Sequence, residues 1–382
     1  MTGRERVLAA FRGAPSDRVP CFEQSLSSTF ASKVLGRAAH TGMGELHLAE
    51  VQSWLSGGEE GHARFVAGLH RDLVDLVRAL GLDGIRPPWR YSRRPARQLS
   101  ESDYEFGEPG TPGHAVMRYS PGSGTFSELG DAAADPGDMD ALERRVEAER
   151  AEWERARAAP PDPEAFRWIR WLRKECPDLA LATTHGFIQI PPHEDWLMAT
   201  ALRPDLVAEH LDIAVEQFLR DLPVLQEIGV DFLHAGGDMA SNAGPVYSPA
   251  VFRELLLPRL RRITAAAHAA GIYYVFRSDG VLWPVGEDLF VRSGVDGYGE
   301  IDIGAGVDLL DARRRYPRLT LFGGVECGEL LTNGTPEAVH AEARRVVRGL
   351  RPGGRHVLGS SNSVSFMVPP ENYRAMLRAA RE

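Results

Sequence analysis

The chain has 382 residues, of which 43% are hydrophobic and 25% are charged, as in an ordinary globular protein. Its formal net charge of −9 argues against nucleic-acid binding, and no apolar run approaches the roughly 20 residues that span a membrane. The three cysteines lack CxxC spacing, so we expect no disulfide framework and a cytoplasmic location. The oligomeric state stays open, with a homodimer as one arrangement.

The first half of the chain is expected to add three features to the fold. The N-terminus is predicted to be a helical extension rather than a signal peptide, because Thr2 and Glu5 have the spacing of a capping box. Residues 97–130 are rich in Gly, Ser and Pro, which predicts a β-hairpin insertion. The segment 131–163 is highly charged and Ala-rich, and it predicts a solvated surface helix.

Strand-like apolar runs alternate with helical segments along the chain. Candidate strands lie at residues 18–26, 82–87, 179–184, 230–234, 272–276, 291–298, 319–325 and 356–359. Most of these eight runs are followed by a helical pattern, which is typical of a parallel α/β fold. We therefore predict that residues 1–382 form one α/β domain, a single (β/α)8 TIM barrel with the extension and insertion described above.

Charged residues follow two successive strands at the point where each ends. Arg277 and Asp279 follow the run 272–276, and Glu300 and Asp302 follow the next strand. Burying unpaired charges is costly, and the site of a parallel barrel lies at the C-terminal ends of its strands. This pattern predicts a site at that face. A structural ion pair between Arg277 and Asp279 is the alternative, and one of the two later acids could instead cap a helix.

Histidines and a further acid follow the third and fourth predicted strands. His185 and His234, with Asp238 nearby, suggest a general acid–base system, because histidine titrates near neutrality. A purely structural role is equally open for each histidine. A metal site built from these three residues and Asp279 is a further alternative.

Several other polar residues near strand ends are candidates for substrate recognition. Arg86 and Arg90 could bind a carboxylate through the planar guanidinium fork. Glu23 and Gln24 lie in the loop of the first strand, and Asn362 follows the last. Asn362 could orient a substrate by hydrogen bonds or simply occupy a turn.

Long stretches of the chain resemble a known superfamily. RERVLAAFRGAPSDRVP near the start, VDFLHAGGDMASNAGPVYSPAVFRELLLPRL in the middle and VLGSSNSVSFMVPPENYRAML near the end are similar to the uroporphyrinogen decarboxylase superfamily. The resemblance covers nearly the whole chain. It implies a TIM barrel with a pocket at the C-terminal ends of the strands. The superfamily includes uroporphyrinogen decarboxylases and zinc-dependent methyltransferases that act with corrinoid proteins.

The chain departs from the decarboxylases at their substrate-binding residues. Those enzymes carry an Arg-rich loop after the first strand, where this chain reads CFEQSLSSTF with Glu23. They place a catalytic Asp after the second strand, where this chain reads GIRPPWR. We therefore expect that uroporphyrinogen is not the substrate.

The chain also departs from the zinc methyltransferases. Their His-x-Cys ligand pair corresponds here to Arg277 and Asp279, and their late Cys corresponds to the region of Asn362. Arginine stays protonated and offers no lone pair to a metal. We expect no zinc ligation of that pattern.

Together, these features predict a uroporphyrinogen decarboxylase-like, metal-independent carbon–carbon lyase that decarboxylates a small acidic or aromatic molecule without a cofactor. The predicted catalytic residues are Asp279, His234, His185, Asp238 and Glu300, and the predicted substrate-binding residues are Arg277, Arg86, Glu23, Gln24 and Asn362. One alternative is a methyltransferase or O-demethylase that uses zinc and a corrinoid protein as its partner. Another is a non-catalytic barrel that binds a small molecule.

Overall fold

The computed structural model describes residues 1–109, 114–129 and 138–382. The helices are α1 (Gly3–Arg12), α2 (Ser28–Leu35), α3 (Met43–Leu80), α4 (Met139–Arg157), α5 (Arg167–Glu175), α6 (Glu194–Leu202), α7 (Pro204–Ile228), α8 (Pro249–Val251), α9 (Leu257–Ala269), α10 (Leu309–Arg315), α11 (Leu330–Asn333), α12 (Pro336–Leu350) and α13 (Pro370–Ala379). The strands are β1 (Gly84–Ile85), β2 (Arg97–Gln98), β3 (Asp103–Phe106), β4 (Ala115–Ser120), β5 (Thr125–Glu128), β6 (Ala180–Thr183), β7 (Phe232–Gly236), β8 (Ala240–Ser241), β9 (Gly244–Pro245), β10 (Tyr273–Arg277), β11 (Gly297–Gly299), β12 (Thr320–Phe322) and β13 (His356–Val357).

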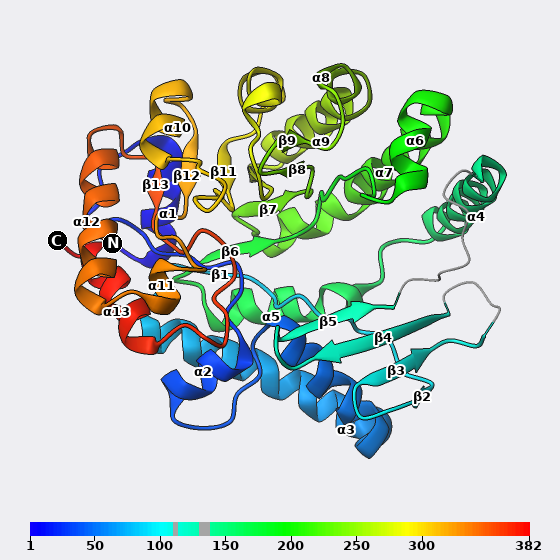
Figure 1. Ribbon diagram of the computed structural model, residues 1–382, viewed down its shortest axis with the longest axis horizontal. Helices are drawn as coiled ribbons and strands as arrows, with labels where there is room; N and C mark the ends of the chain where they lie inside the picture. The colour runs from blue at the N-terminus through cyan, green and yellow to red at the C-terminus, as the bar shows by residue number, and fades with distance from the viewer. Residues whose placement is uncertain (110–113, 130–137) are drawn as a thin grey trace.

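A curved parallel sheet forms the centre of the molecule (Figure 1). Within the described ranges it holds seven strands in the order β1-β6-β7-β10-β11-β12-β13. The segment 20–22 lies between the two end strands. Phe22 N donates to Leu358 O at 3.0 Å on one side, and Asp83 N donates to Cys21 O at 2.7 Å on the other. This segment thus closes the sheet, and the predicted α/β barrel is confirmed.

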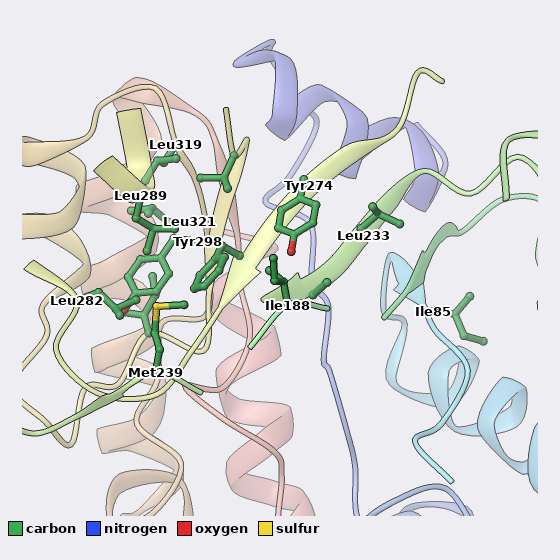
Figure 2. Close-up of a cluster of buried hydrophobic side chains, with 14 of the residues drawn as sticks. Ile85, Ile188, Leu233, Met239, Tyr274, Leu282, Leu289, Tyr298, Leu319 and Leu321 are labelled. Atoms are coloured by element: carbon green, nitrogen blue, oxygen red, sulfur yellow. The ribbon is translucent and has the colours of Figure 1, made fainter. Parts of the chain in front are cut away.

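Alternation along the strands separates an inner core from an outer one. Phe22, Phe232 and Val275 belong to a cluster inside the barrel. Leu233 and Tyr274, one position along, belong to the larger cluster between the strands and the surrounding helices, part of which Figure 2 shows. The side of the barrel that a strand residue faces therefore follows from its position along the strand.

Helix α1 covers the N-terminal end of the barrel. Val7, Ala10 and Phe11 pack with the inner strand residues, and the Phe11 ring stacks on that of Tyr273 with centroids 4.3 Å apart. The helix begins with the expected capping box, in which the Thr2 side chain accepts from the Glu5 backbone. With this end covered, a ligand can reach the barrel interior from the opposite end.

The segment between β1 and α5 adds structure beside the barrel (Figure 1). Strands β2, β3, β4 and β5 form an antiparallel sheet of four strands among the described residues, so the excursion is larger than the hairpin that the sequence predicts. Helix α4 lies within the predicted charged segment, and its Leu142 and Val146 are buried. The predicted ranges 97–130 and 131–163 also include residues 110–113 and 130–137, which lie outside the described residues. No helix in the described part of the chain has the length and apolarity needed to cross a membrane.

Candidate active site

Four polar side chains enter the barrel mouth because they continue the inward-facing positions of their strands. Arg277 ends β10, two residues after the inward-facing Val275. His234 lies on β7 opposite Val275, one layer deeper than Arg277. Gln24 and Arg86 lie two residues beyond Phe22 and Gly84, respectively. The fold thus brings these predicted residues together at the C-terminal ends of the strands, where parallel barrels hold their sites.

Arg277 forms a buried ion pair with Glu300. Nη1 of Arg277 lies 2.6 Å from Oε2 of Glu300, and both side chains are 7% exposed. Glu300 follows β11 with φ of +51°, a left-handed conformation that is unusual for a residue other than glycine. The other oxygen, Oε1, accepts a hydrogen bond from Nε2 of Gln24. The alternative ion pair of Arg277 with Asp279 is therefore wrong, because Glu300 takes that place.

Arg86 is a buried guanidinium for which the described residues provide no carboxylate partner. It is 6% exposed, and its Nε donates to the Gln24 carbonyl at 2.6 Å. Burial, followed by the nearby charge of Arg277, lowers the pKa of Arg86 to about 10. Its Nη1 and the Nε of Arg277 are both buried, and neither has a hydrogen-bond partner among the described residues. Two guanidinium groups thus share one carboxylate, Glu300, and each retains a free donor.

These donors lie beside a cavity of about 260 Å³. Its lining includes Arg86, Arg277 and Glu300, and further residues come from the start of α3 and from the turn between β4 and β5. Ligand pockets usually measure roughly 300–1,000 Å³, so this cavity suits a small molecule. A buried donor without a partner is costly, which makes a bound anion the natural complement of the cavity.

Two aromatic rings flank Arg277, and neither was among the predicted site residues. The guanidinium carbon lies 5.8 Å from the Trp89 ring centroid and 5.6 Å from that of Phe187. Trp89 is 65% exposed and Phe187 is 36% exposed, which is unusual for such large apolar groups. Each ring follows a barrel strand by a few residues, a signal that could have identified them. They give the mouth an apolar wall on which a flat ring can stack.

Asp279 is held at the mouth by Asn362 instead of by an arginine. Nδ2 of Asn362 donates to Oδ1 of Asp279 at 2.7 Å, and Nε2 of Gln24 donates to Oδ1 of Asn362 at 3.1 Å. Burial, and then the negative charges of Glu300, Asp238 and Asp302, raise the pKa of Asp279 to about 7. Asp279 can therefore hold a proton near neutrality and is suited to deliver it.

The two other acids at the mouth differ in their roles. Asp238 is exposed at the rim, and partial burial together with the charge of Glu300 raises its pKa. The carboxylate of Asp302 accepts from the backbone N–H groups of Gly280 at 3.0 Å and Ala305 at 2.9 Å. Asp302 therefore ties two loops together. It does not cap the following helix, α10, as one of the two later acids was expected to do, because Asp308 is the N-cap of that helix.

His234 lies beneath the arginines as a neutral imidazole. Burial, and then the positive charges of Arg86 and Arg277, hold the pKa of His234 well below its usual value. Its Nδ1 has no hydrogen-bond partner in the part of the chain that the structure describes. A Cβ atom built on Gly299 would lie 2.8 Å from Nε2, so the absence of a side chain at Gly299 makes room for the ring. In this state His234 can form a hydrogen bond but cannot supply a proton near neutrality.

Glu23 faces away from the barrel axis and organises the loop that carries Asn362. Oε1 of Glu23 accepts from Ser360 N at 2.7 Å, and its Oε2 lies 2.6 Å from Ser360 Oγ. That hydroxyl also contacts the Asn362 carbonyl, which can only accept a hydrogen bond. The hydroxyl has only one hydrogen, which it donates to the Asn362 carbonyl. The contact with Glu23 is therefore a hydrogen bond when Glu23 is protonated and donates to the hydroxyl oxygen. Burial raises the pKa of Glu23 to about 7, in agreement with this assignment.

Two candidate residues lie apart from this cluster. His185 stacks on Phe166, with ring centroids 5.6 Å apart, and Asp221 of α7 is the charge that acts on it. Its strand β6 directs Ala180 and Ala182 into the barrel, so His185 continues the outward-facing positions. Arg90 instead forms an ion pair with the buried Glu50 of α3. The structure thus separates both residues from the mouth.

The donors at the mouth do not fit a zinc ion of the methyltransferase pattern. Where a metal-binding His would stand, Arg277 pairs with Glu300, and the side chain of Asn362 is engaged by Asp279 and Gln24. Among residues 1–109, 114–129 and 138–382, no three His, Cys, Asp or Glu side chains come together as metal ligands. The alternative metal site that includes His185 has no geometric support, because His185 lies outside the barrel.

Comparisons with known proteins give the family. The family model for uroporphyrinogen decarboxylase (URO-D) matches residues 191–382. Uroporphyrinogen decarboxylase from Shewanella loihica is 28% identical over 145 residues, which are 36% of this chain and 39% of that protein. Methylated-thiol–coenzyme M methyltransferase from Methanosarcina mazei is 24% identical over 184 residues, or 48% of this chain and 46% of that protein. The matched regions thus span less than half the length of these curated relatives.

A solved structure extends the similarity to the whole fold. A methyltransferase from Methanosarcina mazei superposes with a TM-score of 0.63 at 19% identity, covering 100% of this chain and 98% of that one. At this identity the match shows the fold alone. The relatives named here are enzymes of two kinds, decarboxylases and methyltransferases. With half of its length matched by the family model, the chain belongs to the uroporphyrinogen decarboxylase family, as a divergent member.

Proposed function

We propose that the protein is a carbon–carbon lyase that decarboxylates a small aromatic acid, and that uroporphyrinogen is not its substrate. The observation that carries this proposal is the pair of buried, unpartnered guanidinium donors on Arg86 and Arg277 beside a small cavity. These donors suit a carboxylate or another anionic oxygen. The exposed rings of Trp89 and Phe187 suit an aromatic body.

The proposed reaction needs an electron sink and a proton donor. The arginines hold an anionic oxygen that is conjugated with the substrate ring and stays on the product. Protonation of the ring carbon that bears the carboxylate first draws an electron pair from this oxygen into the ring and gives a dienone. When the bond to the carboxylate then breaks, CO₂ leaves, and the electron pair of that bond restores the aromatic ring and the negative charge on this oxygen. The contact with Arg86 and Arg277 then strengthens in the transition state, which is the condition for catalysis.

Asp279 begins the reaction by donating its proton to the ring carbon that carries the carboxylate. Its raised pKa of about 7 keeps a proton available near neutrality. The new C–H bond leaves Asp279 ionised, and solvent returns the proton. In this scheme Asn362 orients the donor, and Gln24 and Glu300 hold the arginine pair in place.

The test is a screen of the purified protein against hydroxybenzoic acids and their O-methyl ethers. We expect CO₂ release from at least one hydroxy acid, and in D₂O a single deuterium at the carbon that lost the carboxylate. The Asp279→Asn variant should release little CO₂. The second candidate, methyl transfer, would instead yield a free phenol from an O-methyl ether when a corrinoid protein is supplied, with no CO₂. That outcome would overturn the lyase proposal.

A further inference from the structure

A second cavity lies at the opposite end of the barrel from the mouth. It measures about 370 Å³ and is bounded by the connection after α1, by the residues that precede β13 and by the end of α13. Figure 1 shows the two termini close together beside α12 in this region. Helix α1 separates this cavity from the barrel interior, so it is distinct from the candidate active site.

Some of the arginines that line the cavity are neutralised within the protein. Arg6 forms ion pairs with Asp17 at 2.7 Å and Asp83 at 3.0 Å, and Arg18 lies 2.6 Å from Asp83. These two arginines therefore balance two carboxylates. The carboxylate of Glu382, which also lines the cavity, is engaged from outside it by Arg344 and His340.

Three further arginines of the lining have no carboxylate partner among the described residues. They are Arg351, Arg355 and Arg381. Arg355 donates through Nη1 to the Phe11 carbonyl at the end of α1 and has a left-handed φ of +54°. Arg351 and Arg381 are exposed, and neither forms an ion pair within the described part of the chain. Three positive charges that no described carboxylate compensates thus surround one cavity, in a protein whose formal net charge is −9.

The rest of the lining adds an acceptor and an apolar wall. His356 is 4% exposed, and its Nε2 lies 2.9 Å from the Gly323 carbonyl. Because a carbonyl can only accept, Nε2 carries the hydrogen. The buried Nδ1 is left as an acceptor for which residues 1–109, 114–129 and 138–382 provide no partner. Val19, Val347 and Leu350 form an apolar part of the wall.

From these features we infer that the cavity at the N-terminal end of the barrel binds a small organic anion with at least two negative charges. A phosphate ester or a dicarboxylate provides oxygens that match the guanidinium fork. An apolar group on the same molecule would cover the wall formed by Val347 and Leu350. Since Arg351 and Arg381 are exposed, binding should weaken as salt is added.

The experiment is isothermal titration calorimetry with two probes, phenyl phosphate and phthalate. Benzoate, titrated into the Arg86→Met variant so that the mouth does not contribute, is a control of lower charge. We expect a saturable site for at least one doubly charged probe and weaker binding of benzoate. Arg351→Gln and Arg381→Gln should each weaken the affinity for that probe about tenfold or more, because each removes a charge-assisted contact. The control Arg378→Gln removes an exposed arginine of α13 that does not line the cavity, and it should leave the affinity unchanged.

Tighter binding of phenyl phosphate would assign a phosphate ester, and tighter binding of phthalate a dicarboxylate. Either result supports a site for a small organic anion with at least two negative charges. The inference fails if neither probe saturates, or if Arg351→Gln and Arg381→Gln bind as the wild type does. It also fails if Arg86→Met at the mouth abolishes the probe binding, because the anion would then occupy the active site. None of these outcomes depends on whether the protein is a lyase.

Discussion

Replacing Arg86 by methionine should leave the protein at least as stable as the wild type while weakening anion binding at the barrel mouth. Burial lowers the pKa of this arginine from its ordinary 12.5 to about 10, which corresponds to roughly 3 kcal/mol of unfavourable free energy for the charged form. Methionine fills a similar volume without a charge. The change also leaves the Gln24 carbonyl without its hydrogen bond, a cost of about 1–3 kcal/mol. We therefore expect the free energy of unfolding to rise by about 0–2 kcal/mol.

The assay combines urea denaturation with calorimetric titration of benzoate on the same variant. The affinity for benzoate should fall at least about tenfold, because a charge-assisted hydrogen bond contributes roughly 1.5–3 kcal/mol. Arg90→Met is the matched control, since Arg90 pairs with the buried Glu50 and does not line the cavity. Removing one partner of such a pair should destabilise by about 3–5 kcal/mol and leave benzoate binding intact. If Arg86→Met is strongly destabilised and still binds benzoate, Arg86 is structural and the reasoning is refuted.

Three further substitutions probe the surroundings of the arginine pair. Asp279→Asn should abolish CO₂ release, and wild-type activity should fall as the pH rises above about 7, where Asp279 loses its proton. Glu23→Gln should be as stable as the wild type below about pH 4.5 and more stable by about 1–3 kcal/mol near pH 8, as urea denaturation would measure. A carboxyl group whose pKa is raised in the folded state destabilises the protein as the pH rises from its unfolded-state pKa to its folded-state pKa. Glutamine has no charge and avoids this loss, and its amide group still donates a hydrogen bond to Ser360. Gly299→Ala should destabilise by roughly 1–3 kcal/mol and weaken benzoate binding, because its Cβ would press on His234.

Each of these expectations has a contrary result. Full activity of Asp279→Asn would remove the proposed proton donor. A stability difference between Glu23→Gln and the wild type that does not change with pH would mean that folding does not raise the pKa of Glu23. Unchanged stability and affinity in Gly299→Ala would show that His234 is not confined by its neighbour.

The sequence was sufficient to predict the barrel because short apolar runs that contain strands, such as the one that ends at Arg277, alternate with helical segments. It was also sufficient for the inward-facing Arg86 and Arg277, since alternation continues two positions beyond Gly84 and Val275. The same alternation, applied to β6, would have placed His185 among the helices. Alternation alone could not place His185, because the sequence does not show which of the two sets of alternating residues on β6 faces the barrel axis.

Other features of the site and of the insertion could not be predicted from the spacing of residues along the sequence. Glu300 would face outward by alternation, and only its left-handed backbone turns it towards Arg277. The bond between Asn362 and Asp279 joins residues 83 positions apart, through the closure of the barrel. The insertion was expected to be a hairpin because its first short strand, Arg97–Gln98, is exposed and carries no apolar pattern.

The central claim is that Arg86 and Arg277 together receive an anionic oxygen at the barrel mouth. A crystal of the protein soaked with 4-iodobenzoate tests it directly, because the anomalous signal of iodine locates the ring and its orientation. We expect the carboxylate against Nη1 of Arg86 and Nε of Arg277, with the ring beside Trp89 or Phe187. A crystal in which the ligand lies elsewhere on the protein, while the mouth stays free of it, would contradict the claim.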